Sequence, residues 1–208
     1  GRLNMVEFAY GLTGHNEITG DVQNPLSPDH ITGGSSSGPA AAVSGNLSYG
    51  SLGSDTGGSI RFPASCCGLV GMKPTYGLVS RYGTMPLSFS LDHIGPLTRT
   101  VSDCALLTQI ISGPDENDPT SLKHQKNNYL EKIESGINGI KIGVPRTNFV
   151  DQVDVEVLRE MRKSLEVFKS LGANILEIDL PESFNISNEM ANIITAVEGS
   201  SAHRKWLK

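Results

Sequence analysis

Two glycine- and serine-rich segments in the first third of the chain hold residues that could do chemistry. The first reads Gly-Gly-Ser-Ser-Ser-Gly over residues 33–38, and the second reads Asp-Thr-Gly-Gly-Ser over residues 55–59. Successive small residues leave backbone N–H groups free and let a ligand approach the main chain closely. Acyl transfer needs such donors beside a hydroxyl nucleophile, because they stabilise the oxyanion that develops during attack. A serine nucleophile at Ser59 is therefore one interpretation of this pattern.

Each segment also has a plainer interpretation. A short Gly-Gly-Ser run is typical of an ordinary turn, because motifs of this length often match by chance. A phosphate-binding loop is disfavoured, since the chain contains no Gly-Lys-Ser or Gly-Lys-Thr sequence. The adjacent pair Asp92 and His93 suggests a Ser-His-Asp triad, but neighbouring side chains diverge and would form a poor proton relay. The segments alone leave the chemistry open.

The metal-binding residue types give no sign of a metal site. The chain has three cysteines, an odd number without the spacing of metal ligands. We interpret Cys66, Cys67 and Cys104 as reduced, buried thiols. Four histidines are likewise scattered without metal-ligand spacing: His15, His30, His124 and His203. We therefore expect no metal and no other cofactor.

The first half of the chain must position the two segments. Pro39 follows the first segment and suits the first turn of a helix, so a Gly/Ser loop should open onto a packed helix. A strand-like run leads into the second segment, and residues 60–63 and 68–71 are predicted as loop and buried strand. Thr100 and Asp103 form a capping-box pattern that would begin a helix over residues 104–112.

The second half has more regular patterns. Residues 113–138 are polar and are predicted as a surface loop with a short helix. Residues 140–144 and 175–178 are strand-like, and between them apolar residues recur at helical spacing over residues 154–171. Gly172 is expected to end that helix. A strand–helix–strand unit of this length predicts a parallel strand pair and an α/β fold.

Taken together, the two segments resemble the amidase signature family. Ser35 lies 24 positions before Ser59, the separation that this family has between the corresponding serines. Further stretches carry the same resemblance: residues 4–11, 71–77, 90–101 and 139–145. The resemblance implies an α/β fold with a mixed β-sheet core flanked by α-helices on both sides. It implies that residues 1–208 are the central part of a single amidase signature domain, incomplete at both ends.

The resemblance also implies a mechanism. A carboxamide would be hydrolysed to a carboxylic acid and ammonia or an amine through an acyl-enzyme on Ser59. The Gly34–Ser35 peptide bond would be cis, and the Ser35 hydroxyl would lie within hydrogen-bond reach of Ser59. Ser35 would pass the proton from Ser59 to a neutral lysine that lies upstream of residue 1. Lys73 is a substitute candidate, but its segment is a separate structural element in the family. Residues 1–208 alone are accordingly expected to be inactive.

Other residues take roles by the same resemblance. The oxyanion hole would consist of backbone N–H groups of Thr56, Gly57 and Gly58, together with that of Ser59. Ala9 falls where the family lines its pocket beside the scissile group. Asp55 and Arg61 flank the second segment, and we expect them to brace it through hydrogen bonds.

Net charge and hydrophobicity indicate which kinds of partner the chain can have. The formal net charge of −5 gives no basic surface, which argues against nucleic acid as a direct ligand. No apolar run approaches the roughly 18 residues that a membrane span requires. We therefore expect a cytoplasmic protein with a small-molecule amide substrate, and a homodimer is compatible with this interpretation.

Two alternatives stay open. One is the glutaminase (A) subunit of a tRNA-dependent amidotransferase. By resemblance, this subunit uses the same Ser-Ser-Lys triad as the amidases and needs partner subunits for full activity. That subunit usually has Gly-Ser-Ser-Thr-Glu where residues 11–16 here read Gly-Leu-Thr-Gly-His-Asn, which favours a stand-alone amidase. The other is a non-catalytic binding relative, against which the intact Ser35 and Ser59 argue.

Overall fold

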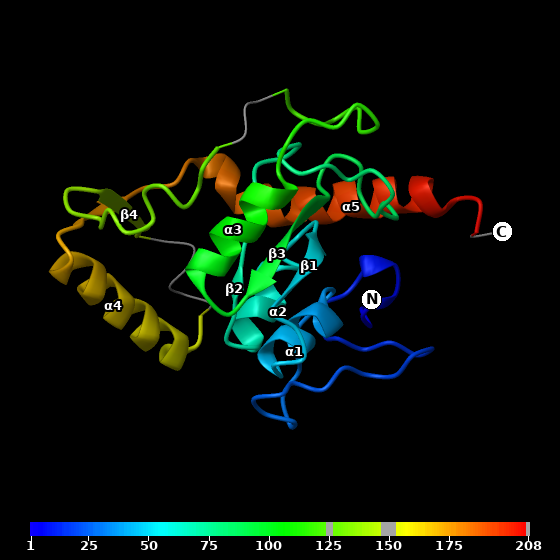
Figure 1. The fold of residues 1–208 in the computed structure, drawn as a ribbon, viewed down its shortest axis with the longest axis horizontal. Helices are drawn as coiled ribbons and strands as arrows, with labels where there is room; N and C mark the ends of the chain where they lie inside the picture. Colours follow the sequence, from blue (N-terminus) through cyan, green and yellow to red (C-terminus); the bar gives the residue numbers. More distant parts are fainter. Residues whose placement is uncertain (124–126, 147–152, 207–208) are drawn as a thin grey trace. The chain divides into compact units, whose positions relative to one another are not determined.

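The computed structural model describes residues 1–123, 127–146 and 153–206, and Figure 1 shows it as a ribbon. The chain divides into two compact units. The first contains residues 1–131 and 193–208, and the second contains residues 132–192. The Gly/Ser segments both lie in the first unit.

A three-stranded antiparallel sheet organises the first unit. Its strand order is β1-β3-β2, with β3 between the other two. The register pairs Gly50 with Thr98 at one end of β1 and Asp55 with His93 at the other. The elements of this unit up to residue 131 are η1 (Glu7–Ala9), α1 (Ser37–Ser44), β1 (Gly50–Asp55), α2 (Arg61–Cys66), β2 (Val70–Gly71), β3 (His93–Thr98) and α3 (Val101–Ile111).

Small residues let the helices approach this sheet closely. A Cβ atom at Gly53 in β1 would lie 2.6 Å from the Ser36 hydroxyl oxygen, and one at Gly95 in β3 would lie 2.1 Å from the Met72 carbonyl oxygen. Neither position can hold a larger side chain without displacing backbone or a buried group. The buried cluster beside them consists of Ala40, Ile60, Ala64, Cys67 and Leu97. The core of this unit therefore lies directly beneath the two Gly/Ser segments.

Residues 60–63 and 68–71 agree only in part with the prediction of loop and buried strand. The chain here forms α2 over Arg61–Cys66, followed by the two-residue strand β2. The helix begins where Phe62 N–H donates to Gly58 O at 2.7 Å. Pro63 fits here because the first turn of a helix has no internal acceptor for its missing N–H.

The second unit contains the predicted strand–helix–strand pattern. β4 (Lys141–Pro145) and β5 (Asn174–Ile178) pair in parallel, and α4 (Val155–Ser170) connects them. Asp154 caps α4 by accepting a hydrogen bond from Glu156 N–H at 2.8 Å. Gly172, with φ of 90°, follows the helix as expected. This part of the sequence prediction is confirmed.

The remaining helices are η2 (Glu182–Ile186) and α5 (Ser187–His203), and α5 begins in the second unit and ends in the first. The described residues between 113 and 138 form turns and no helix, so the short helix predicted there is not found in them. The α/β class is confirmed, with the antiparallel and parallel strand pairs in two separate sheets among the described residues. In the same residues, every helix falls short of the length and apolarity needed to cross a bilayer.

The cap of α3 gives a test of this local structure. Thr100 Oγ1 accepts a hydrogen bond from Asp103 N–H at 3.1 Å and donates one to the Asp103 carboxylate at 2.7 Å. Thr100→Ala removes both interactions and should lower the free energy of unfolding by about 1 kcal/mol, whereas Thr100→Ser should retain most of it. Chemical denaturation of the intact protein measures both variants. Equal stabilities for the alanine and serine variants would contradict the cap.

Candidate active site

The two Gly/Ser segments lie against each other. Ser36 N–H donates to the backbone carbonyl of Ser59 at 3.2 Å. The Gly34–Ser35 peptide bond is cis, as predicted. Ser35 is fully buried and Ser59 is 5% exposed. The expected hydrogen bond between their hydroxyls is not present, because the Ser35 hydroxyl has no partner among the described residues.

Ser36, which sequence analysis did not single out, fixes this arrangement. Its hydroxyl donates to the carbonyl of Ser54 at 3.2 Å and accepts from the N–H of Ser54 at 3.2 Å. The middle serine of the first segment is therefore attached to the end of β1, just before the second segment. Nothing in a run of three serines distinguishes this one, so the contact could not be foreseen.

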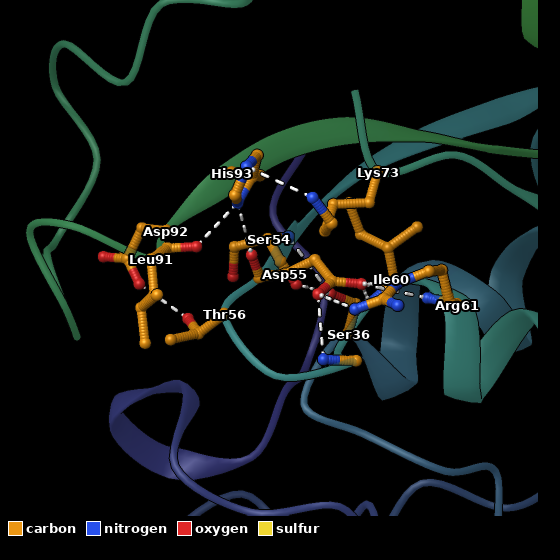
Figure 2. Close-up of polar contacts among 11 residues, drawn as sticks. Ser36, Ser54, Asp55, Thr56, Ile60, Arg61, Lys73, Leu91, Asp92 and His93 are labelled. Atoms are coloured by element: carbon orange, nitrogen blue, oxygen red, sulfur yellow. Dashed lines mark hydrogen bonds and ion pairs between the residues drawn. The ribbon is translucent and has the colours of Figure 1, made fainter. Parts of the chain in front are cut away.

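Asp55 is the centre of the second segment. Its buried carboxylate accepts hydrogen bonds from the backbone N–H groups of Gly58, Ile60 and Arg61, at 2.8, 3.1 and 3.3 Å. The guanidinium of Arg61 adds two more, at 3.0 and 2.9 Å, in a bidentate pair. Figure 2 shows these contacts converging on the carboxylate. The expected brace of Asp55 and Arg61 is thus present, and its contribution to catalysis stays a prediction.

The environment of Asp55 keeps it charged. Burial alone would raise the pKa of its carboxyl group, but the hydrogen bonds from Arg61 and Ile60 outweigh burial and hold the pKa below the ordinary range. The hydrogen bond to Asp55 correspondingly raises the pKa of Arg61. An ionised carboxylate therefore holds the loop at neutral pH.

The hydrogen bonds to Asp55 occupy some of the backbone N–H groups of residues 56–59 and leave others free. The N–H of Gly58 donates its hydrogen bond to the Asp55 carboxylate. Gly58 is therefore a poorer candidate for the oxyanion hole than its sequence position suggested. The N–H groups of Thr56, Gly57 and Ser59 form no hydrogen bond with any described residue. These three N–H groups are therefore free to donate hydrogen bonds to the oxygen of a bound ligand.

His93 links this loop to Lys73. Its Nδ1 lies 2.6 Å from the carbonyl of Leu91 and 3.3 Å from that of Asp55, and its Nε2 lies 3.3 Å from Lys73 Nζ (Figure 2). Since a carbonyl can only accept, Nδ1 carries the proton and Nε2 accepts from the ammonium. Burial first, and the charge of Lys73 second, hold the pKa of His93 below its usual value. The ring is therefore neutral at neutral pH.

The neighbouring Asp92 serves a different purpose. Its carboxylate accepts from the Thr56 hydroxyl at 2.6 Å and from the N–H groups of Leu87 and Ser88 at 2.8 and 3.0 Å. It does not contact the ring of His93, which confirms that this pair is a poor Ser-His-Asp relay. Lys73 is likewise engaged with His93, while the hydroxyl of Ser35 has no partner in the described part of the chain.

A cleft of about 590 Å³ opens beside the loop, and we call it the Thr56 cleft. Thr56 and Ala9 both line it, as do Ser36, Ser54 and Asp92. Ala9 and the preceding Phe8 have φ of 59° and 53°, a left-handed conformation that is uncommon for residues other than glycine. The structure thus brings Ala9 and Thr56 to one cavity, whose described lining does not include Ser35 or Ser59.

The cysteines do not take part in this site. Burial raises the pKa of the Cys67 thiol to about 11, so that it is protonated and unreactive at neutral pH. Cys66 is half-buried, in contrast to the prediction, because adjacent residues at the end of α2 face different directions and only Cys67 meets the core. In the described ranges, no cluster of histidine, cysteine and acidic side chains is arranged to hold a metal ion. His124 lies outside these ranges.

Comparison with known proteins places this site in a family. The family model described as Amidase matches residues 1–208. The chain belongs to the amidase signature family. This confirms the resemblance on which the site residues were assigned.

Individual relatives agree with this membership. The A subunit of the glutamyl-tRNA(Gln) amidotransferase of Trichlorobacter lovleyi is 44% identical over 201 residues, covering 97% of this chain and 41% of that protein. The corresponding A subunit numbered 2 of Clostridium acetobutylicum is 48% identical over 205 residues, covering 97% and 42%. The chain therefore spans about two fifths of the length of these curated relatives.

Solved structures give the same result. The A subunit of the glutamyl-tRNA(Gln) amidotransferase of Thermotoga maritima matches with a TM-score of 0.93 and 42% identity, over 98% of this chain and 45% of that one. The peptide amidase from Stenotrophomonas maltophilia matches with a TM-score of 0.88 and 32% identity, over 99% and 44%. The chain thus shares its fold with amidases and with components of amidotransferases.

The Asp55 brace predicts a pH-dependent stability. Asp55→Asn should lower the free energy of unfolding by about 2–3 kcal/mol at pH 7, because charged hydrogen bonds to Arg61 and three N–H groups are weakened. The folded-state pKa of Asp55 is depressed, so its stabilisation is present above the unfolded pKa and is lost as the pH falls through the folded one. The difference between wild type and variant should therefore shrink below about pH 4.

Thermal unfolding of the intact protein between pH 3 and pH 8 measures this difference. Asp179→Asn is a matched control, since the Asp179 side chain is 77% exposed and its ion pair with Arg146 lies at the surface. That variant should change stability by less than about 1 kcal/mol. An Asp55→Asn effect that stays constant down to pH 3 would rule out the charged brace.

Proposed function

We propose that the chain carries the nucleophile of an amide hydrolase, with Ser59 as the residue that is acylated. The observation that carries this proposal is the hydroxyl of Ser35. It is fully buried and has no hydrogen-bond partner among the described residues. A buried hydroxyl left without a partner costs free energy. Ser37 shares this property, and what distinguishes Ser35 is its place next to Ser36, whose N–H binds the carbonyl of Ser59 in the nucleophile segment.

The proposed reaction begins with proton transfer. The Ser59 hydroxyl attacks the carbonyl carbon of a carboxamide, and its proton passes to Ser35 and from there to a lysine outside residues 1–208. The free N–H groups of Thr56, Gly57 and Ser59 are the candidate donors to the oxyanion of the tetrahedral intermediate. Breakdown of that intermediate returns a proton to the leaving nitrogen and releases ammonia or an amine. Water then hydrolyses the acyl-enzyme to the carboxylic acid.

Lys73 does not suit the role of that lysine. Its ammonium is hydrogen-bonded to the neutral ring of His93, whereas the Ser35 hydroxyl has no partner among the described residues. A base for Ser35 must lie within hydrogen-bond reach of its hydroxyl, and Lys73 does not. We therefore keep the proposal that residues 1–208 lack the base and are inactive alone.

The second candidate is a glutaminase component of an amidotransferase. It is favoured by the 44% and 48% identity to proteins named as A subunits of glutamyl-tRNA(Gln) amidotransferases. Residues 11–16 argue against it, because they depart from the usual sequence of that subunit. In this segment His15 pairs with Asp21 at 2.5 Å, and Asn16 accepts from the N–H groups of Ile18 and Thr19. We therefore propose a stand-alone amidase that acts on a small-molecule amide in the cytoplasm.

A set of three serine variants tests the roles of Ser59 and Ser35. In the intact protein, Ser59→Ala should abolish amide hydrolysis, and Ser35→Ala should lower kcat by several orders of magnitude, because the hydroxyl nucleophile is lost or left poorly activated. Ser37→Ala is the matched control. Ser37 is also fully buried with an unpartnered hydroxyl, so its removal is structurally equivalent to that of Ser35.

All three variants should unfold within about 1 kcal/mol of wild type, because no hydrogen bond of the replaced hydroxyl to a described residue is lost at Ser35 or Ser37. Only the Ser37 variant should retain activity. A fluorophosphonate probe should label Ser59 in wild type, as read by peptide mass spectrometry. Turnover by Ser59→Ala, or equal activity losses in the Ser35 and Ser37 variants, would contradict the assignment.

Substrate range separates the two candidate functions. The intact protein, purified alone, should release ammonia from simple aliphatic and aromatic amides without tRNA or a second protein. An amidotransferase component should instead act on glutamine and need its partners for full activity. The assay compares ammonia release from a small amide panel and from glutamine. Activity confined to glutamine, and appearing only with partner subunits, would select the second candidate.

A further inference from the structure

A second cavity, of about 680 Å³, lies beside the Thr56 cleft in the first unit. We call it the His203 pocket. Its lining joins the N-terminal segment to the end of α5 and includes Val6, Phe8, Tyr10, Leu87, His203 and Trp206. Phe8 and Leu87 also line the Thr56 cleft, so the two cavities share these side chains as a common wall. A ligand whose amide occupies the cleft could therefore extend past Phe8 into the pocket.

His203 gives this pocket an unused polar group. Its side chain is 8% exposed, and neither ring nitrogen has a hydrogen-bond partner among the described residues. The ring packs against Phe8 and Trp206, with centroid distances of 4.9 and 5.3 Å. Buried polar atoms are normally paired, and each ring nitrogen of a histidine can take part in a hydrogen bond. The pocket thus combines aromatic walls with hydrogen-bonding capacity that the protein itself leaves unfilled.

Charges around the pocket select against anionic ligands. Glu7 and Glu17 line it, and neither forms an ion pair with another described residue. His15 also lines it and is paired with Asp21. No lysine or arginine is present in the described lining. A carboxylate or phosphate on the ligand would therefore meet like charges without a compensating cation.

We propose that the His203 pocket binds the body of the amide substrate, and that this body is a neutral or cationic aromatic group bearing a hydrogen-bonding substituent for His203. The cavity volume falls in the range of roughly 300–1,000 Å³ that is typical of small-ligand sites. The assignment rests on the proposed function, because it places the amide at the end of the cleft lined by Thr56, whose N–H is one of the candidate oxyanion donors. It goes further by naming the class of substrate.

Paired substrates and a shape-conserving variant test the proposal in the intact protein. His203→Phe keeps the aromatic packing and removes both nitrogens. It should raise KM about tenfold for 4-hydroxyphenylacetamide, whose hydroxyl can bond to His203, and leave KM for phenylacetamide within about twofold. The kcat for propionamide, which is too short to pass Phe8, should be unchanged. A role of His203 in stability alone would affect all three substrates alike and would overturn the proposal.

His30→Phe is the matched control, because His30 is an exposed histidine whose ring bonds only to Ser27 among the described residues. It should alter none of these constants. Wild type should also discriminate against 4-carboxyphenylacetamide relative to the hydroxyl compound. Equal kcat/KM for the two would contradict the role assigned to Glu7 and Glu17.

A binding measurement separates failure of this proposal from failure of the proposed function. Calorimetry of 4-hydroxyphenylacetamide with the Ser59→Ala variant needs no turnover, and adding His203→Phe should weaken binding about tenfold. If wild type hydrolyses no amide but this difference remains, the function fails and the pocket assignment stands. If residues outside 1–208 fill the pocket, the ligand will bind equally with and without His203, and the assignment is overturned.

Discussion

The buried carboxylate of Asp55 is the interaction on which the candidate site depends. It receives three backbone N–H groups and both arms of the Arg61 guanidinium, and so joins the end of β1 to the beginning of α2. The residues between these elements have little freedom once both ends are held. Because the charge that holds them belongs to the protein, the loop is arranged without a ligand, which is the arrangement that the proposed stabilisation of an oxyanion requires.

Neighbouring elements hold the same loop from other sides. Ser36, just before α1, bonds to both backbone groups of Ser54, and Asp92, just before β3, bonds to the hydroxyl of Thr56. His93 adds a contact from its ring to the carbonyl of Asp55. The close approach that these contacts require is possible because Gly53 and Gly95 have no side chain. Packing of the sheet and geometry of the site are therefore consequences of the same short distances.

Sequence reasoning succeeded where the signal was local or carried by a long motif. The cap at Thr100, the β4-α4-β5 unit and the family membership all follow from residues close in the chain or from a motif matched over residues 1–208. It failed where a tertiary contact decided the outcome. Ser36 matters through Ser54, 18 residues away, and His203 matters through the absence of a hydrogen-bond partner among the described residues. α2 was missed for a local reason, since its first N–H groups donate to Asp55, five and six residues earlier.

The donors that this loop leaves unpaired among the described residues are main-chain N–H groups, at Thr56, Gly57 and Ser59, and these are the donors proposed for the oxyanion. Only substitution by proline deletes a peptide N–H, so these donors are insulated from most point mutations. The walls of the neighbouring cavities, such as Phe8 and Leu87, have no such protection and can change one residue at a time. A fold built in this way can drift from one substrate to another during evolution while its chemistry is inherited intact.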